Sequence, residues 1–171
     1  MQHINTLQGT IGKTDMFNNS TITATTQCVG FARNWLESHL GMTFSQVKLA
    51  ADIWQSINHY QRLSDSSSHL VNNRKNGGRH PPQQGDLIIY HKNLLGTGHV
   101  AVVTDIKDNK TILVTEQNYL NRYQSPSHRR AIAFSQRGNS YWLQDRFIIG
   151  WKQINANGII QRQHNRGTTN E

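Results

Sequence analysis

The hydrophobic positions that follow residue 24 recur every three or four residues, which is the period of an α-helix. The apolar pairs on this face are Val29 and Ala32, Phe31 and Trp35, and Leu36 and Leu40. Thr25 or Thr26 is a suitable N-cap and Gly41 a suitable end, so the pattern predicts a helix between them. Cys28 would then lie in the first helical turn. The polar, weakly patterned residues 1–24 are expected to form a loop.

A second helical stripe follows the first. Thr43 and Gln46 have the T-x-x-Q spacing of a capping box. The stripe continues through Val47, Ala50, Ala51, Trp54, Ile57 and Tyr60 or Gln61. The pattern predicts a second helix that starts at the capping box. Residues 64–84 are polar, which predicts a loop. Such a length is unusual in a compact domain, so we expect the loop to be either mobile or functional.

The period then changes to that of β-strands. The segments rich in Val, Ile and Thr are 86–91, 99–106, 111–118, 130–134 and 147–154. Residues 156–171 are polar without periodicity and predict a C-terminal tail. Helices followed by an antiparallel meander predict one α+β domain over residues 1–155.

Composition narrows the function classes only in part. The chain has 18 Lys and Arg against 10 Asp and Glu, a net charge of +8. Such a charge suits an acidic polymer, either nucleic acid or an anionic cell wall, but it also describes an ordinary solvated surface. The basic residues are scattered and form no nucleic-acid-binding motif, so a non-catalytic basic binding module is the weaker alternative and nucleic acid is not the expected partner.

Targeting and metal-binding patterns are missing from the sequence. The start, MQHINTLQGT, has no apolar core typical of a signal peptide, and no apolar run approaches about 18 residues. We therefore expect a protein that is cytoplasmic as synthesised and does not enter a membrane; export by a specialised route remains open. The histidines form no H-x-x-x-H pair and there is no second cysteine, so we expect neither metal nor cofactor.

The one cysteine, Cys28, is either a small buried hydrophobe or a nucleophile. The thiolate is the reactive form, and the free N–H groups and dipole of a helix N-terminus favour it. The same amides can help to form an oxyanion hole. A first-turn position therefore suits a nucleophile, although many buried cysteines also lie in helices.

The predicted hairpin of strands 99–106 and 111–118 supplies a partner for a nucleophile. A two-residue turn at Asp108–Asn109 would place His99 opposite Asn118, with Glu116 on the diagonal. All three side chains would then project from one face. This suits a base held by a third group, so we expect a hydrogen bond from the His99 ring to Glu116 or Asn118. A turn one residue longer would move Glu116 to the other face.

Four ordered segments carry a family resemblance. They are QCVGFARNWL at 27–36, TGHVAVVTD at 97–105, TEQN at 115–118 and IIGW at 148–151. Together with GDLIIY they resemble the CHAP family, the cysteine- and histidine-dependent amidohydrolases and peptidases. Within it they are similar to the amidase domain of glutathionylspermidine synthetase/amidase. The resemblance implies a papain-like fold, with N-terminal helices packed on an antiparallel β-sheet.

The resemblance also implies roles for single residues. It makes Cys28 the nucleophile, His99 the general base, Glu116 the orienting carboxylate and Asn118 a supporting polar group. Gln27 is the candidate oxyanion donor. A further position, Arg33, is a candidate for substrate contact, or else a surface charge of the helix.

Two positions depart from the pattern of the amidase domain. Gly30 replaces an acidic residue, and Thr26 replaces an aromatic one. The resemblance implies cleavage of a small glutathionylspermidine-type amide. The basic charge instead suits a cell-wall peptidoglycan amide, because a basic protein does not attract a cationic polyamine conjugate at long range. Both substrates remain open at this point.

Overall fold

The computed structural model describes residues 19–108, 110–119 and 128–155, of which 19–26 are described as backbone only. Of the expected N-terminal loop, residues 1–18 lie outside this part of the chain, whereas residues 19–24 belong to a helix, so the loop prediction is wrong there. The expected tail lies wholly outside the described residues. The helical elements are α1 (Asn19–Leu40), the 3₁₀ turn η1 (Ala50–Asp52) and α2 (Ile53–Ser56). The first strands are β1 (Met42–Thr43), β2 (His59–Arg62), β3 (Ser68–Lys75) and β4 (Leu87–Tyr90). The others are β5 (His99–Lys107), β6 (Thr111–Thr115), β7 (Arg129–Arg137), β8 (Ser140–Leu143) and β9 (Ile148–Ile154).

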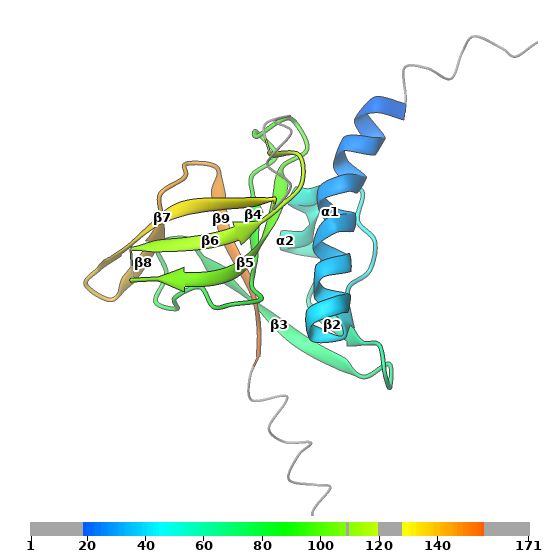
Figure 1. Cartoon of the computed structure of the whole chain (residues 1–171), viewed down its shortest axis with the longest axis horizontal. Helices are drawn as coiled ribbons and strands as arrows, with labels where there is room; N and C mark the ends of the chain where they lie inside the picture. Colours follow the sequence, from blue (N-terminus) through cyan, green and yellow to red (C-terminus); the bar gives the residue numbers. More distant parts are fainter. Residues whose placement is uncertain (1–18, 109, 120–127, 156–171) are drawn as a thin grey trace, which may run out of the picture.

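The strands of the described residues form one antiparallel sheet in the order β1-β2-β3-β9-β4-β5-β6-β7-β8. The long helix α1 lies to one side of this sheet and contacts β1 and β5 (Figure 1). The α+β class predicted from the sequence is therefore confirmed, with one long N-terminal helix in place of two.

The centre of the sheet is buried on both faces. In β4, Leu87 and Ile89 join the apolar cluster that includes Leu36 of α1, whereas Ile88 and Tyr90 join a second cluster with β6 and β7. Alternate side chains of a strand point to opposite faces, so a strand covered on both sides is apolar throughout. This explains the continuous LIIY run and gives the start of β5 a rigid neighbour.

The predicted second helix is wrong in extent. Met42 and Thr43 pair with Arg62 and Gln61 in a β-ladder, and only short helical turns lie between the two strands. Tyr60, expected on a helical stripe, is instead a fully buried strand residue. The apolar spacing was compatible with a helix, but pairing between the two ends of the segment holds both ends extended.

The predicted 64–84 loop is also wrong, because it contains β3. In this strand His69 and Val71 point inward while Leu70 is exposed. The strand joins β2 to β9 and so connects two parts of the sheet. Because β3 has few apolar side chains, its sequence shows no clear two-residue alternation. Its extended conformation depends on pairing with β2 and β9. The short strand β8 was likewise not expected from the sequence, whereas the five strands that were predicted are all present.

Candidate active site

Cys28 lies on α1 with 4% of its surface exposed and packs within the apolar cluster between α1 and the sheet. The helix starts at Asn19, so Cys28 is well inside it and the predicted first-turn position is wrong. Inside an α-helix each N–H is directed at the carbonyl four residues earlier. The backbone N–H of Cys28 is therefore not a free oxyanion donor, and any activation of the thiol falls to neighbouring side chains.

In the β5–β6 hairpin the predicted register is present at the open end, but the turn differs from the predicted one. Its closing pair is Lys107 with Thr111, so the connection is one residue longer than a two-residue turn. A register shift between Val103 and Asp105 then takes up the extra residue, and Val102 pairs with Thr115. The bulge restores the predicted pairing at the open end of the hairpin, because a bulge inserts one residue in one strand.

His99, at the start of β5, therefore meets Glu116. His99 Nε2 and Glu116 Oε2 are 2.9 Å apart, and the exposed fractions of the two residues are 1% and 0%. This confirms the predicted hydrogen bond. The His99 ring is also hydrogen-bonded to the Cys28 side chain. Since Glu116 takes Nε2, the ring presents Nδ1 to the sulfur. The three side chains form a continuous polar chain, which begins at Cys28 in the apolar cluster between α1 and the sheet.

Arg130, at the start of β7, completes the surroundings of Glu116. Arg130 Nε donates to Glu116 Oε1 at 2.5 Å and Arg130 Nη2 to Glu116 Oε2 at 3.2 Å. Arg130 Nη2 also donates to the Tyr90 hydroxyl at 2.6 Å. Arg130 is not among the site residues expected from the sequence. The β6–β7 register pairs Arg130 with Val114, two positions from Glu116 on the same face, but the length of the intervening connection prevents the register from being deduced.

The electrostatics follow from this burial and pairing. Burial works to raise the pKa of Glu116, but hydrogen bonds and charges from His99 and Arg130 outweigh it and the pKa is lowered. Burial works to lower the pKa of His99, but the hydrogen bonds and charges of Cys28 and Glu116 outweigh it and the pKa is raised. The site thus favours the ionised form of Glu116 and makes His99 a stronger proton acceptor than a free imidazole.

Gln27, directly before Cys28 in α1, contacts Asn118, two residues after Glu116. The Asn118 side-chain amide donates to Gln27 Oε1. Asn118 follows the end of β6 and has a φ of 60°, a conformation that Asn tolerates better than most residues. The hydrogen bond joins Gln27, the candidate oxyanion donor, to Asn118, the predicted supporting group. Glu116 rather than Asn118 is the partner of His99 Nε2.

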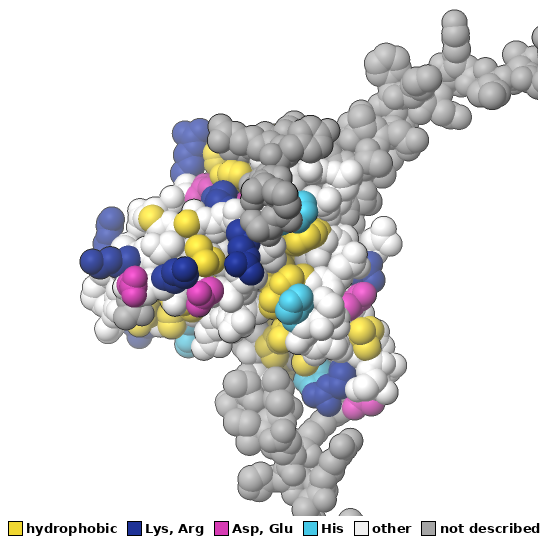
Figure 2. Space-filling model, viewed as in Figure 1, with side chains coloured by type: hydrophobic (Ala, Val, Ile, Leu, Met, Phe, Trp, Pro, Cys, Tyr) yellow, Lys and Arg dark blue, Asp and Glu magenta, His cyan; other side chains and the backbone are white. Residues whose placement is uncertain are grey.

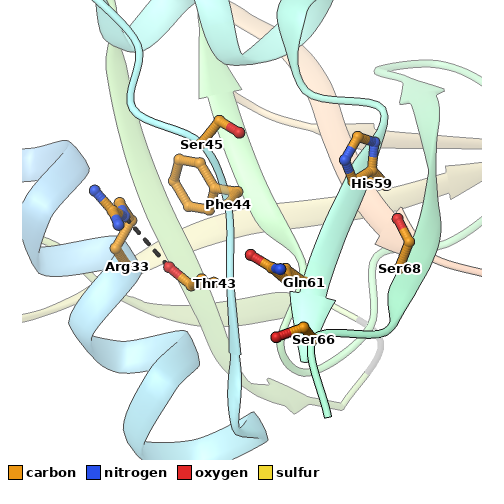
Figure 3. Close-up of a pocket in the computed structure, with 8 residues that line it drawn as sticks. All are labelled: Arg33, Thr43, Phe44, Ser45, His59, Gln61, Ser66 and Ser68. Carbon is orange, nitrogen blue, oxygen red and sulfur yellow. Dashed lines mark hydrogen bonds between the residues drawn. The ribbon is translucent and has the colours of Figure 1, made fainter. Parts of the chain in front are cut away.

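Arg33 lies apart from the other candidate residues. It is five residues after Cys28, roughly 140° around the helix. It lines a cavity of about 280 Å³ with Thr43, Phe44, Ser45, His59, Gln61, Ser66 and Ser68. Figure 3 shows Arg33 reaching from α1 toward Thr43, whose hydroxyl is 3.4 Å from Arg33 Nε. Substrate contact by Arg33 therefore remains a prediction, and Cys28 and His99 do not line its cavity.

Two further features concern metal binding and membrane insertion. Among them, no three His, Cys, Asp or Glu side chains are grouped so as to hold a metal ion. In the same part of the chain, no helix is both long and apolar enough to cross a membrane.

Comparison with known proteins assigns the chain to a class. The CHAP domain family matches residues 17–118, and the chain belongs to this family. That range includes the helix of Cys28 and the hairpin of His99 and Glu116. The family assignment agrees with the α+β fold and defines the chain as an amidohydrolase domain of the CHAP type.

Among individual proteins, the chain is similar to the bifunctional glutathionylspermidine synthetase/amidase of Escherichia coli strain K12. The two are 30% identical over 133 residues, which is 73% of this chain and 21% of that protein. The Shigella flexneri protein of the same name gives the same figures. Trypanothione synthetase of Crithidia fasciculata is 32% identical over 94 residues, 54% of this chain and 14% of that protein. The matches thus span about a fifth or less of each relative.

Proposed function

We propose that this protein hydrolyses an amide bond with Cys28 as nucleophile and His99 as general base. The observation that carries the proposal is the buried chain of contacts from Cys28 through His99 to Glu116. A nucleophile, a base and a group that orients the base are the three parts that covalent acyl transfer needs.

The reaction would proceed in two halves. His99 Nδ1 takes the thiol proton, the Cys28 sulfur bonds to the substrate carbonyl carbon, and the C–N bond then breaks as His99 returns the proton to the leaving amine. A water molecule attacks the resulting thioester, giving its proton to His99, and the acid product leaves as Cys28 regains its proton. Throughout, Glu116 holds the imidazole by Nε2 and stabilises its protonated form.

Gln27 is the proposed donor to the oxyanion. Its Oε1 is taken by Asn118, so the amide nitrogen is the end of the side chain that remains to donate. In this arrangement Asn118 orients the Gln27 side chain. The Cys28 backbone N–H lies inside α1, so stabilisation of the oxyanion depends more on the Gln27 side chain than it would if Cys28 were at a helix terminus.

For the substrate, we propose a glutathionylspermidine-type conjugate on the basis of the similarity to the bifunctional enzymes. A peptidoglycan amide is the second candidate, and two observations favour it. The chain has a net charge of +8, and Figure 2 shows its Lys and Arg side chains gathered largely over the sheet, with Asp and Glu among them. Of the described carboxylates, Glu116 and Asp145 at the site are bonded within the protein and not free to hold a cationic chain.

The test compares both substrates on wild type and Cys28→Ala. With glutathionylspermidine, we expect release of spermidine and a glutathionyl adduct on Cys28 that intact-mass analysis detects after rapid quenching. Release of peptide from purified sacculi with no release of spermidine would replace the substrate and leave the catalytic roles in place. Activity that survives in Cys28→Ala would overturn the mechanism itself.

A further inference from the structure

The carboxylate of Glu116 is the most enclosed charged group of the site. Its exposed fraction is 0%, and both of its oxygens accept hydrogen bonds from Arg130 while one also contacts His99. A buried carboxylate is costly unless it is paired and hydrogen-bonded. The site therefore needs a cation beside Glu116. Arginine suits this position because its guanidinium does not easily lose its proton.

The guanidinium of Arg130 is itself held from several sides. Its edge contacts Glu116 and the Tyr90 hydroxyl, and its face lies over the Tyr119 ring with Cζ 3.8 Å from the ring centroid. The Tyr119 hydroxyl in turn donates to Asp145 Oδ2 at 2.9 Å. The same Tyr119 ring lies 5.4 Å from the His99 ring, centroid to centroid. One aromatic side chain thus packs on both cationic partners of Glu116.

We propose that Arg130 is a positioning residue that keeps Glu116 ionised and holds its Oε2 against His99 Nε2, so that the Cys28 thiolate and the His99 imidazolium form together. The proposal rests on the catalytic roles assigned to Cys28 and His99. It adds a fourth member to their chain, one that touches neither the substrate nor the nucleophile.

The groups that face Glu116 decide the direction of the effect. They are His99 from β5, Arg130 from β7, Tyr90 from β4 and Tyr119 from the connection after β6. Asp145, from the connection after β8, acts on Tyr90 and Tyr119. Cys28 of α1 lies beyond His99. Without Arg130 the buried carboxylate would keep one cationic partner, and burial would raise its pKa. A neutral Glu116 supports the imidazolium less, so the thiolate would form at higher pH.

Iodoacetamide reports the thiolate without the need for a substrate. It forms an S–C bond to Cys28 with loss of iodide, and only the thiolate reacts appreciably. We would measure its rate against pH, between about pH 5 and pH 9, in wild type and Arg130→Met. We expect the midpoint of alkylation to rise by about one pH unit. The matched control is Arg137→Met, an exposed position at the other end of β7, where no shift is expected.

A double substitution separates positioning from a merely structural effect. In a Glu116→Gln background there is no carboxylate to keep ionised, so Arg130→Met should add no further shift. An unchanged or lowered midpoint in Arg130→Met alone, or an equal shift in both backgrounds, would overturn the proposal. If Arg130→Met does not fold, Arg130→Lys keeps the charge but loses the two-pronged contact, and a midpoint identical to that of wild type would likewise overturn it. Amidase activity retained by Cys28→Ala would instead refute the proposed function, whatever the alkylation midpoints are.

Discussion

His99 Nε2 is hydrogen-bonded to the carboxylate of Glu116 and not to the side chain of Asn118, two residues later in the chain. Glu116 makes the contact because it is still held in line with β6, with its N–H bonded to the His128 carbonyl, whereas Asn118 has already left the strand at a φ of 60°. A buried carboxylate beside an imidazole stabilises its charged form more than a neutral amide does. The identity of the third residue is therefore decided by where the strand ends.

At this scale we predict unequal losses on substitution of the base and of its partner. His99→Ala should lower kcat/KM by roughly 10²–10⁴-fold, because the proton acceptor is gone. Glu116→Gln should lower it less, since the base is intact and the amide oxygen still accepts a hydrogen bond. Steady-state kinetics on whichever substrate is cleaved, with circular dichroism as a check of folding, would measure both. A larger loss in Glu116→Gln than in His99→Ala would show that the carboxylate does more than orient the ring.

Among the elements, the start of β5 depends on a close approach of three backbones. Gly98, directly before His99, has a φ of +72°. A Cβ there would lie 2.6 Å from the Tyr90 carbonyl oxygen and 2.8 Å from Ala51 Cβ. Only glycine lets β5 begin this close to the end of β4 and to η1. The residue thus sets the position of His99 without any chemistry of its own.

We predict that Gly98→Ala destabilises the fold by more than about 1 kcal/mol and slows alkylation of Cys28, because the strain and the contacts displace His99. The matched control is Gly96→Ala in the same connection. Gly96 has a φ of +73°, but an added Cβ there meets nothing within 4 Å. Chemical denaturation and the alkylation rate would compare the two variants. Equal effects would mean that the backbone angle, and not the close approach, is what matters.

At the scale of the whole molecule, one buried acid connects strands that are distant in sequence. Asp86, just before β4, accepts hydrogen bonds from the Gln83 backbone and from Gln153 of β9. Gln153 accepts one from Arg74 of β3. Burial raises the pKa of Asp86 to about 7, although these hydrogen bonds and the Arg74 charge oppose it. The folded protein therefore holds a proton on Asp86 that the unfolded chain releases at lower pH.

The sign of the pH effect follows from that shift. In the unfolded chain an Asp has a pKa of about 3.9, so between there and about pH 7 folding keeps a proton that unfolding loses. Stability should fall as pH rises through this interval, by up to about 1.4 kcal/mol per pH unit, and then level off. Asp86→Asn should reduce the decline, as chemical denaturation at several pH values would detect. Asp105→Asn, an exposed position, is the control, and an unchanged slope in Asp86→Asn would refute the assignment.

The strands from β4 onward, with the exception of β8, and the pairing of Cys28, His99 and Glu116 could be predicted from the sequence. Apolar runs and two-residue alternation are local patterns, and their burial follows from them directly. The bulge opposite Leu113 could not be predicted, because it appears only when two strands are aligned along their whole length. By chance, the extra residue in the turn and the bulge cancel, so the simple register was right at the site and wrong near the turn.

Tertiary structure alone decided the remaining features. Residues 42–43 and 68–75 are strands because distant segments pair with them, and their own side chains carry weak or misleading periodicity. Arg130 joins the site through the β6–β7 register, which no local pattern reveals. Single residues and apolar periods are properties of neighbouring positions along the chain. Partnerships between strands depend on the whole fold, because each buried charge or backbone group takes the partner that the assembled sheet provides.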